Sequence, residues 1–282
     1  MPAPPPHLES GSGPLDVAAL RAAGFATVVH RAEVGSTMDD ARRLADDPDT
    51  ALPAVVVADR QAAGRGRRGA GWWQAPGALA ASIVVDGGGA GAPRPTWALA
   101  CGVALAEAIR ALEPGVAPVV RWPNDIEVAG RKLAGVLVET AAHARAVVGI
   151  GVNTAGSAAA APETLRDRVA TLPDLAGRPL GRDDLLAAFL PRFIEIIGSL
   201  GRGGDTLIRR YRPLCALDGT VVTLHAGSER HAGVCRGIAA SGALVIDTAA
   251  GRREFTSGSL NDPASVWPSV AGQPQDPSQP RS

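Results

Sequence analysis

The chain has 282 residues, of which 46% are hydrophobic and 20% charged, so it can bury a sizeable core and is not globally disordered. Lys plus Arg and Asp plus Glu each number 28, and a net charge of zero argues against a general nucleic-acid coat protein. Three scattered cysteines exclude a disulfide framework or a paired-cysteine zinc site, so we expect no metal-ligating residues.

Both ends of the sequence are rich in Pro, Gly and Ser, and we expect flexible tails at residues 1–14 and 268–282. The first residues carry no basic segment followed by an apolar one, and no apolar run is long enough to span a bilayer. We therefore expect a cytoplasmic protein without contact to a membrane.

Predicted helices and strands alternate between the two tails. Ser36 and Thr37 are good helix caps, and the acidic residues after them favour a helix through Leu44. Two further helices are predicted over residues 95–112 and 182–211. Apolar, β-branched runs predict strands at residues 26–31, 54–60, 79–86, 119–122, 126–128, 132–139 and 146–152.

Several strands in close succession around few helices predict an α+β fold with a mixed sheet, and not a doubly wound one. From residue 215 to 263, short β-rich runs alternate with glycine-containing turns, a pattern typical of a small β-barrel. We place the boundary near Pro213, which gives a main domain over residues 15–213 and a small domain over residues 214–267.

The first segment with chemical potential is Gly-Arg-Gly-Arg-Arg-Gly at residues 64–69. Glycines allow close backbone approach, and arginine forks suit carboxylates and phosphates. The alternatives are a solvated basic loop or an RNA-binding patch. Trp72 and Trp73 follow directly, and since the chain has ten aromatic residues, their position is informative. We expect one of them to stack on a ligand and the other to lie in the core.

The second segment is Arg-Trp-Pro-Asn-Asp at residues 121–125. Pro123 ends a strand and turns the chain, so Asn124 and Asp125 project from the strand end. Such side chains suit a phosphate with its cation or a substrate amide. The alternative is an Asx turn that caps a hairpin.

The third segment is Lys-Leu-Ala-Gly-Val-Leu-Val-Glu at residues 132–139. Lys132 is the one lysine in the chain, and the other 27 residues of the Lys-plus-Arg count are arginines. This usage favours a position that needs an ammonium group over the alternative of a surface lysine. Gly135 within the strand indicates close approach of a ligand or of backbone.

The fourth segment ends a strand with Gly-Val-Asn, and Asn153 could offer its amide to a nucleobase edge. A turn asparagine is an equal alternative.

Together, and in this order, the Ser-Thr pair and the four segments resemble the biotin–protein ligases. The resemblance covers roughly residues 26–260. It implies a class II synthetase-like mixed sheet flanked by helices, followed by a small SH3-like barrel. It also implies an ATP-dependent ligase that forms biotinyl-5′-AMP and pyrophosphate, then transfers biotin to a lysine of a biotin carboxyl carrier domain. Biotin and ATP are the substrates, with Mg²⁺ expected on the polyphosphate.

The resemblance also implies roles for individual residues. The catalytic residues would be Lys132, Arg67 and Asp125. Biotin would be bound by Ser36, Thr37, Met38, Gln61, Arg65, Gly66, Arg67, Lys132 and Gly135. ATP would be bound by Arg68, Trp72, Asn124, Asp125 and Asn153.

Two departures from the family pattern bear on these roles. Met38 stands where asparagine is common, so its backbone would have to serve. The end of the barrel, residues 257–260, lacks the acidic residue often present there. Little sequence precedes the catalytic segments, so we expect the monofunctional type without DNA binding, as a monomer or a homodimer.

Two other classes of function are alternatives to a biotin–protein ligase. Lipoate or octanoate ligases and transferases share the fold but typically carry a histidine after their glycine-rich signature, and no histidine lies near residues 64–69. A nucleic-acid binder would use the arginine segment and the barrel, which the zero net charge and sparse aromatics oppose.

Overall fold

The computed structural model describes residues 14–87, 95–200 and 206–260. Both expected tails, apart from Pro14, lie outside the described residues. No helix among the described residues is long and apolar enough to cross a membrane.

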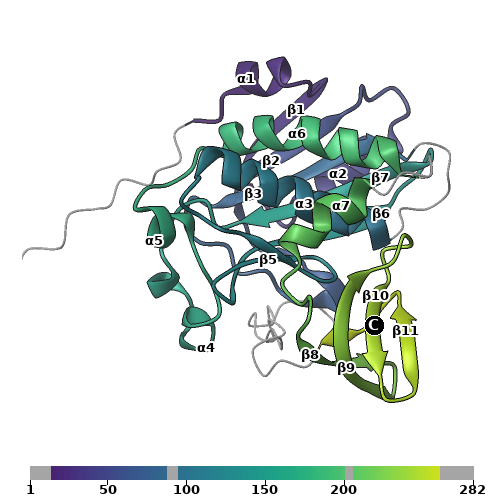
Figure 1. Cartoon of the computed structure of the whole chain (residues 1–282). Coiled ribbons are helices and arrows are strands. Elements are labelled where there is room, and N and C mark those ends of the chain that lie inside the picture. The colour runs from purple at the N-terminus through teal and green to yellow at the C-terminus, as the bar shows by residue number, and fades with distance from the viewer. Residues whose placement is uncertain (1–13, 88–94, 201–205, 261–282) are drawn as a thin grey trace, which may run out of the picture.

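A mixed seven-stranded sheet forms the centre of the molecule, in the order β1-β2-β3-β7-β6-β5-β4 (Figure 1). Its strands are β1 (Thr27–Val34), β2 (Ala54–Gln61), β3 (Leu79–Asp86), β4 (Val119–Arg121), β5 (Asp125–Val128), β6 (Arg131–Thr140) and β7 (Arg145–Val152). β1 and β2 run parallel, and every other neighbouring pair is antiparallel. The predicted α+β class and mixed sheet are confirmed.

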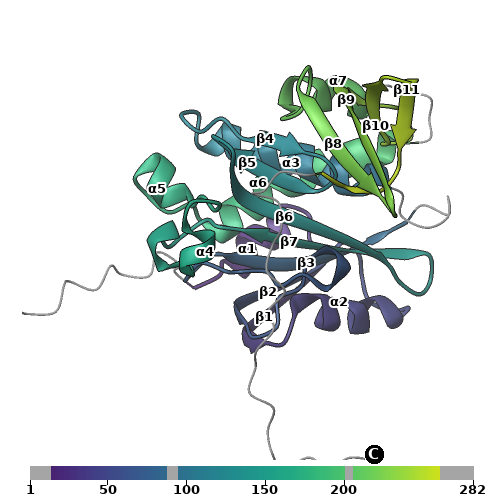
Figure 2. The same cartoon turned by 90° about the horizontal axis from the view of Figure 1, so that it is seen from below.

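Helices cover both faces of this sheet (Figures 1 and 2). α3 (Pro95–Leu112) and α6 (Arg182–Ser199) pack on one face over the larger apolar core. α2 (Thr37–Asp46) packs on the other face over a smaller cluster that includes Met38, Val56 and Val147. Because side chains alternate along each strand, one sheet supplies both cores.

The remaining helices are short. They are α1 (Val17–Ala22), α4 (Glu163–Arg166), α5 (Leu172–Ala176) and α7 (Thr206–Tyr211). The single helix predicted over residues 182–211 was wrong, because α6 ends at Ser199 and the backbone of Leu200 is extended. The sequence that follows, Gly-Arg-Gly-Gly, has poor helix propensity.

The C-terminal strands form a second, antiparallel sheet in the order β11-β10-β9-β8-β12. They are β8 (Val221–Ala226), β9 (Glu229–Ile238), β10 (Leu244–Thr248), β11 (Gly251–Phe255) and β12 (Ser259–Leu260). The small β-rich unit was predicted, but within residues 206–260 no pairing joins β11 to β12, so the sheet is not a closed barrel.

The two sheets share one apolar core. Leu224, Ile246 and Phe255 of the small sheet belong to the same cluster as α3 and α6. The indole Nε1 of Trp122 donates to the carbonyl of Gly242 at 3.1 Å. The small sheet is therefore packed against the end of the large sheet that carries β4 and β5.

Candidate active site

A cavity of about 450 Å³ lies where the arginine loop (residues 64–72), the start of α2, strands β5 to β7 and strand β12 meet. Thirteen residues predicted from the sequence line it. They are Ser36, Thr37, Met38, Gln61, Arg65, Gly66, Arg67, Arg68, Trp72, Asn124, Asp125, Lys132 and Gly135. Segments up to 224 positions apart in sequence (Ser36 and Leu260) thus meet in one hollow.

The floor of the cavity is a row of directly paired strand residues. Arg121 pairs with Asp125, Asp125 with Gly135, Gly135 with Gly151, and Gly151 with Ala80. Paired residues project from the same face of a sheet. The row therefore places a carboxylate beside two adjacent positions that carry no side chain.

The two glycines leave room for Trp72. A Cβ on Gly151 would lie 2.5 Å from Cε2 of the Trp72 ring, and one on Gly135 would lie 3.3 Å from its Cζ3. The indole thus lies directly over bare backbone. Met38 uses Gly149 in the same way, since a Cβ there would lie 2.7 Å from its Sδ.

A β-bulge aims Lys132 into this site. Ile126 pairs with Ala134, but Glu127 pairs with Lys132, so β6 has one extra residue there. The extra residue turns the lysine side chain to the same face of the sheet as Gly135. A Cβ built on Gly135 would lie 3.2 Å from Cε of Lys132.

Lys132 lies at the centre of a charged cluster. Its Nζ is 2.7 Å from Oδ1 of Asp125 and 5.6 Å from the centroid of the Trp72 ring. Both charged side chains are largely buried, with 13% and 23% of their side-chain surface exposed. The cluster presents an ammonium to the cavity at a fixed position.

Arg67 adds a second cation at the same end. Its Nη1 donates to Oδ1 of Asn124 at 3.2 Å, while Nδ2 of Asn124 donates to the carbonyl of Val136 at 2.9 Å. Burial, together with the charge of Arg68, lowers the pKa of Arg67, although Asp125 acts in the opposite direction. Arginine remains charged despite such a shift, so this end of the cavity suits an anion.

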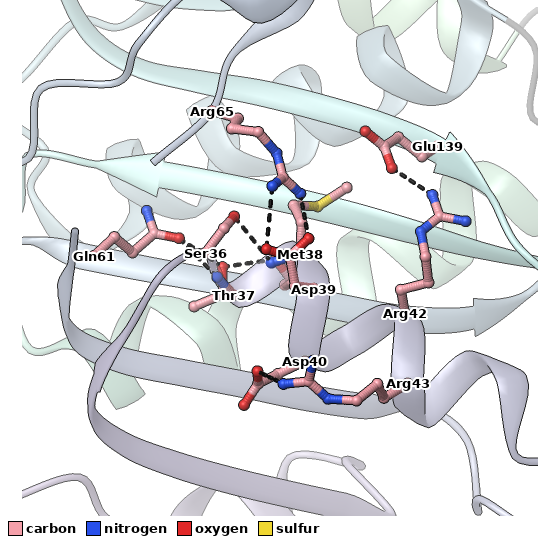
Figure 3. Close-up of polar contacts among 11 residues, drawn as sticks. Ser36, Thr37, Met38, Asp39, Asp40, Arg42, Arg43, Gln61, Arg65 and Glu139 are labelled. Atoms are coloured by element: carbon pink, nitrogen blue, oxygen red, sulfur yellow. Dashed lines mark hydrogen bonds and ion pairs between the residues drawn. The ribbon is translucent and has the colours of Figure 1, made fainter. Parts of the chain in front are cut away.

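At the opposite end, where Arg65 pairs with Asp39, Ser36, Thr37 and Gln61 offer uncharged polar groups (Figure 3). Ser36 is the N-cap of α2, and its hydroxyl accepts from the backbone N–H of Met38 at 3.4 Å. The backbone N–H and the hydroxyl of Thr37 both donate to Oε1 of Gln61, at 2.9 and 3.0 Å. Thr37 also bonds Ser82 at 2.7 Å. These groups can donate to and accept from a neutral polar ring.

The three arginines of the loop bind three different elements. Arg65 pairs with Asp39 on α2, Arg67 bonds Asn124 beside β5, and Arg68 bonds the hydroxyl of Ser259 in β12. The loop therefore covers the cavity while connected to both sheets.

One predicted residue is not brought to the cavity. Asn153 is almost fully buried, and its Nδ2 donates to the carbonyl of Ala170 at 3.0 Å. Its Oδ1 has no hydrogen-bond partner among the described residues. Trp73, by contrast, packs against the apolar cluster of Ala158 and Leu165, as expected for one of the two tryptophans.

Sequence reasoning assigned no site role to several lining residues, among them Arg121, Gly149 and Gly151, which lie in the second and fourth segments, and Ser259. The two glycines alternate along β7, and alternation places them on one face, so this signal was present in the sequence. Ser259 carries no local signal. Among the described residues, no group of three or more His, Cys, Asp or Glu side chains could hold a metal ion.

Known proteins resemble this chain closely. The model of the biotin/lipoate A/B protein ligase family matches residues 36–153. A biotin–[acetyl-CoA-carboxylase] ligase of Paracoccus denitrificans is 31% identical, over 79% of this chain and 95% of that protein. The ligase of the same name from Mycobacterium tuberculosis is 29% identical, over 84% of this chain and 85% of that protein.

A solved structure of a biotin protein ligase also resembles this chain. The biotin protein ligase from Aquifex aeolicus in complex with biotin and ATP matches with a TM-score of 0.73 and 27% identity. The match covers 84% of this chain and 98% of the Aquifex chain.

Proposed function

We infer that this chain, which belongs to the biotin/lipoate A/B protein ligase family, is a biotin–protein ligase that uses ATP to join biotin to a carrier lysine. The observation that carries this function is one cavity with a neutral polar end at Thr37 and Gln61 and a cationic end at Arg67 and Lys132. Biotin has the matching ends, a neutral ureido ring and a carboxylate.

The first step joins two anions. The biotin carboxylate oxygen attacks the α-phosphorus of ATP, the bond from that phosphorus to the bridging oxygen breaks, and pyrophosphate leaves with the electron pair. Two anions repel each other unless cations offset their charge. We assign this work to Lys132 and Arg67, because pre-positioned charge stabilises a transition state without reorganisation. Positioning both reactants supplies the rest of the barrier reduction.

The other predicted residues receive roles from their places around the cavity. Ser36, Thr37 and Gln61 would bind the ureido ring, and the arginine loop would cover biotin and the acyl phosphate. Trp72 would stack on adenine. Gly135 and Met38 would form walls beside biotin.

Asn153 would offer its Oδ1 to the adenine edge, because this buried atom has no hydrogen-bond partner among the described residues while Nδ2 bonds Ala170.

Mg²⁺ would enter with ATP. Magnesium in nucleotide sites commonly takes one or two carboxylates together with phosphate oxygens and water. Asp125 is the acidic side chain among the described residues that line the cavity, and its carboxylate fits such a hard cation. The ion would neutralise charge on the polyphosphate.

The second step transfers the acyl group. The uncharged amine of a carrier lysine attacks the carbonyl carbon of biotinyl-AMP, the bond from that carbon to the phosphate oxygen breaks, AMP leaves with the electron pair, and the new amide nitrogen releases a proton to water. Asn124 and Asp125 would face this incoming amine. The acceptor would be the biotin carboxyl carrier domain of a carboxylase in the cytoplasm. We propose a catalytic unit over residues 15–213 and a small unit over residues 214–267.

ATP–pyrophosphate exchange tests the function directly. The purified chain with Mg²⁺ is given biotin, lipoate or octanoate in parallel reactions. We expect exchange with biotin alone. Exchange only with lipoate or octanoate would assign the chain to the lipoate branch of the family, and no exchange with any acid would refute an adenylating enzyme.

A further inference from the structure

The arginine loop behaves as one small structural unit. The N–H of Gly66 donates to the carbonyl of Ala70 at 2.7 Å, and the N–H of Trp72 donates to the carbonyl of Gly64 at 2.9 Å. Arg65 and Gly71 form an isolated β-bridge between these bonds. A loop closed by its own hydrogen bonds keeps its shape, so its position over the cavity depends on its external contacts.

The contact with Asp39 is the strongest of the side-chain contacts made by the three arginines. Nη1 and Nη2 of Arg65 donate to the two carboxylate oxygens of Asp39, at 3.1 and 2.6 Å. Arg67 and Arg68 each bond a neutral oxygen instead, on Asn124 and Ser259. A bidentate pair between ions is roughly twice as strong as a bond to a neutral acceptor and also fixes direction.

Asp39 is placed to connect the cover of the cavity to its polar end (Figure 3). It lies in the first turn of α2, two residues after Thr37, whose N–H and hydroxyl bond Gln61. Asp39 itself is not among the residues that line the cavity. Any effect it has on a bound acid must therefore act through Arg65.

We propose that Asp39 is a positioning residue that holds the arginine loop closed over the cavity from its polar end and thereby slows escape of the bound acid. The proposal rests on the proposed function for the identity of that acid. The side chains of Arg65 and Asp39 are 42% and 47% exposed, so salt screens the pair. An exposed pair can also break and re-form, which lets substrate enter.

Asp39→Asn tests the proposal, with Asp40→Asn as the matched control. Asp40 is the next residue of the same helical turn, but it pairs with Arg31 and Arg43, away from the loop (Figure 3). For Asp39→Asn we expect the rate of biotin release and the KM for biotin in pyrophosphate exchange to rise about fivefold. The kcat should stay within twofold of the unaltered protein, and Asp40→Asn should match that protein in all three constants.

Changes in ionic strength and a second substitution distinguish loss of the Asp39–Arg65 contact from a general disturbance of the site. Raising NaCl should increase the KM of the unaltered protein and of Asp40→Asn by a larger factor than that of Asp39→Asn, which keeps the salt-sensitive cations of the site but lacks the Asp39–Arg65 pair. If both side chains act through one contact, Asp39→Asn combined with Arg65→Gln should be no worse than Arg65→Gln alone. Multiplying effects, or a loss confined to kcat, would overturn the proposal.

Trypsin gives a measurement that needs no activity. The loop contains three arginines, and cleavage within residues 65–69, located by mass spectrometry, reports how often the loop leaves its closed position. We expect about fivefold faster cleavage there in Asp39→Asn than in Asp40→Asn. Equal cleavage rates refute the positioning role, whereas faster cleavage in a protein without biotin-dependent exchange would refute the proposed function and leave the loop contact standing.

Discussion

Lys132 is the side chain whose removal should cost the reaction most. Its ammonium lies at the cationic end of the cavity beside Asp125, near the start of β6, where a bulge turns it toward the cavity. Lys132→Ala should lower the rate of biotin-dependent pyrophosphate exchange by about 10²–10³-fold, the usual loss for one pre-positioned charge donor. The thermal midpoint should fall as well, because Asp125 loses the partner of a largely buried ion pair, so exchange is compared at a temperature at which both proteins are folded.

The conservative substitution is informative as well. Lys132→Arg keeps the charge but replaces a compact ammonium with a larger planar group, so exchange should also fall. Turnover by Lys132→Ala at the unaltered rate would remove Lys132 from the mechanism.

Gly151 tests the assignment of Trp72 to the nucleotide. A Cβ at this position would lie 2.5 Å from the indole ring, so Gly151→Ala should displace the ring. We expect the KM for ATP to rise about tenfold and the KM for biotin to change by less than threefold.

Gly115→Ala is the matched control, because no atom lies within 4 Å of a Cβ built there. A Gly151→Ala variant that binds ATP normally would contradict the stacking role.

At the scale of elements, Arg145 holds α2 in place. The guanidinium is buried and donates to the carbonyls of Asp47 and Pro48, at 2.6 and 2.8 Å. It also reaches the carbonyls of Leu44 and Thr50 at 3.3 Å. These carbonyls at the end of α2 have no further turn of helix to bond them, so one side chain from β7 satisfies several of them.

Removing this side chain should destabilise the protein strongly. Arg145→Met removes the donor from several part-buried carbonyls, and we expect the free energy of unfolding to fall by about 1–3 kcal/mol. Urea denaturation measures it. A loss below about 0.5 kcal/mol would show that water replaces the guanidinium.

Elements were predicted best where the signal is local. The strand over residues 79–86 and the helix over residues 95–112 coincide with β3 and α3, since continuous apolar runs with clear ends specify them. The helix predicted through 211 failed because apolar periodicity says nothing about a glycine-rich break within it.

The site was predictable to the extent that its residues lie in compact motifs. Contacts between distant segments were not, because no local pattern links Arg65 to Asp39 or Arg68 to Ser259. The bulge at Lys132 follows from its pairing with Glu127, which also depends on tertiary structure.

At the scale of the whole molecule, the carboxylates set the response to acid. The Arg65 guanidinium lowers the pKa of Asp39, and hydrogen bonds from Arg252 and Arg236 lower the pKa of Asp247 to about 2. The pKa values of Asp59 and Asp174 are also lowered, because hydrogen bonds outweigh the effect of burial.

A lowered pKa means that the folded protein binds fewer protons than the unfolded chain below about pH 4. The stabilisation is therefore complete above that pH and is lost as the pH falls toward 2. We expect the free energy of unfolding in urea to decrease from pH 5 to pH 3. The slope should be shallower in Asp247→Asn and in 0.5 M NaCl, and a flat profile would contradict the ion pairs.

The burial of the single lysine affects how readily the enzyme can be acylated by its own reaction intermediate. A mixed anhydride that escapes a ligase acylates nearby amines, and a typical protein surface presents many of them. Here the surface cations are arginines, whose guanidinium groups stay protonated and do not attack acyl groups at neutral pH. The one side-chain amine is inside the cavity, engaged by Asp125. Because arginine replaces lysine elsewhere, the enzyme has no lysine amine on its surface that its own mixed anhydride could biotinylate.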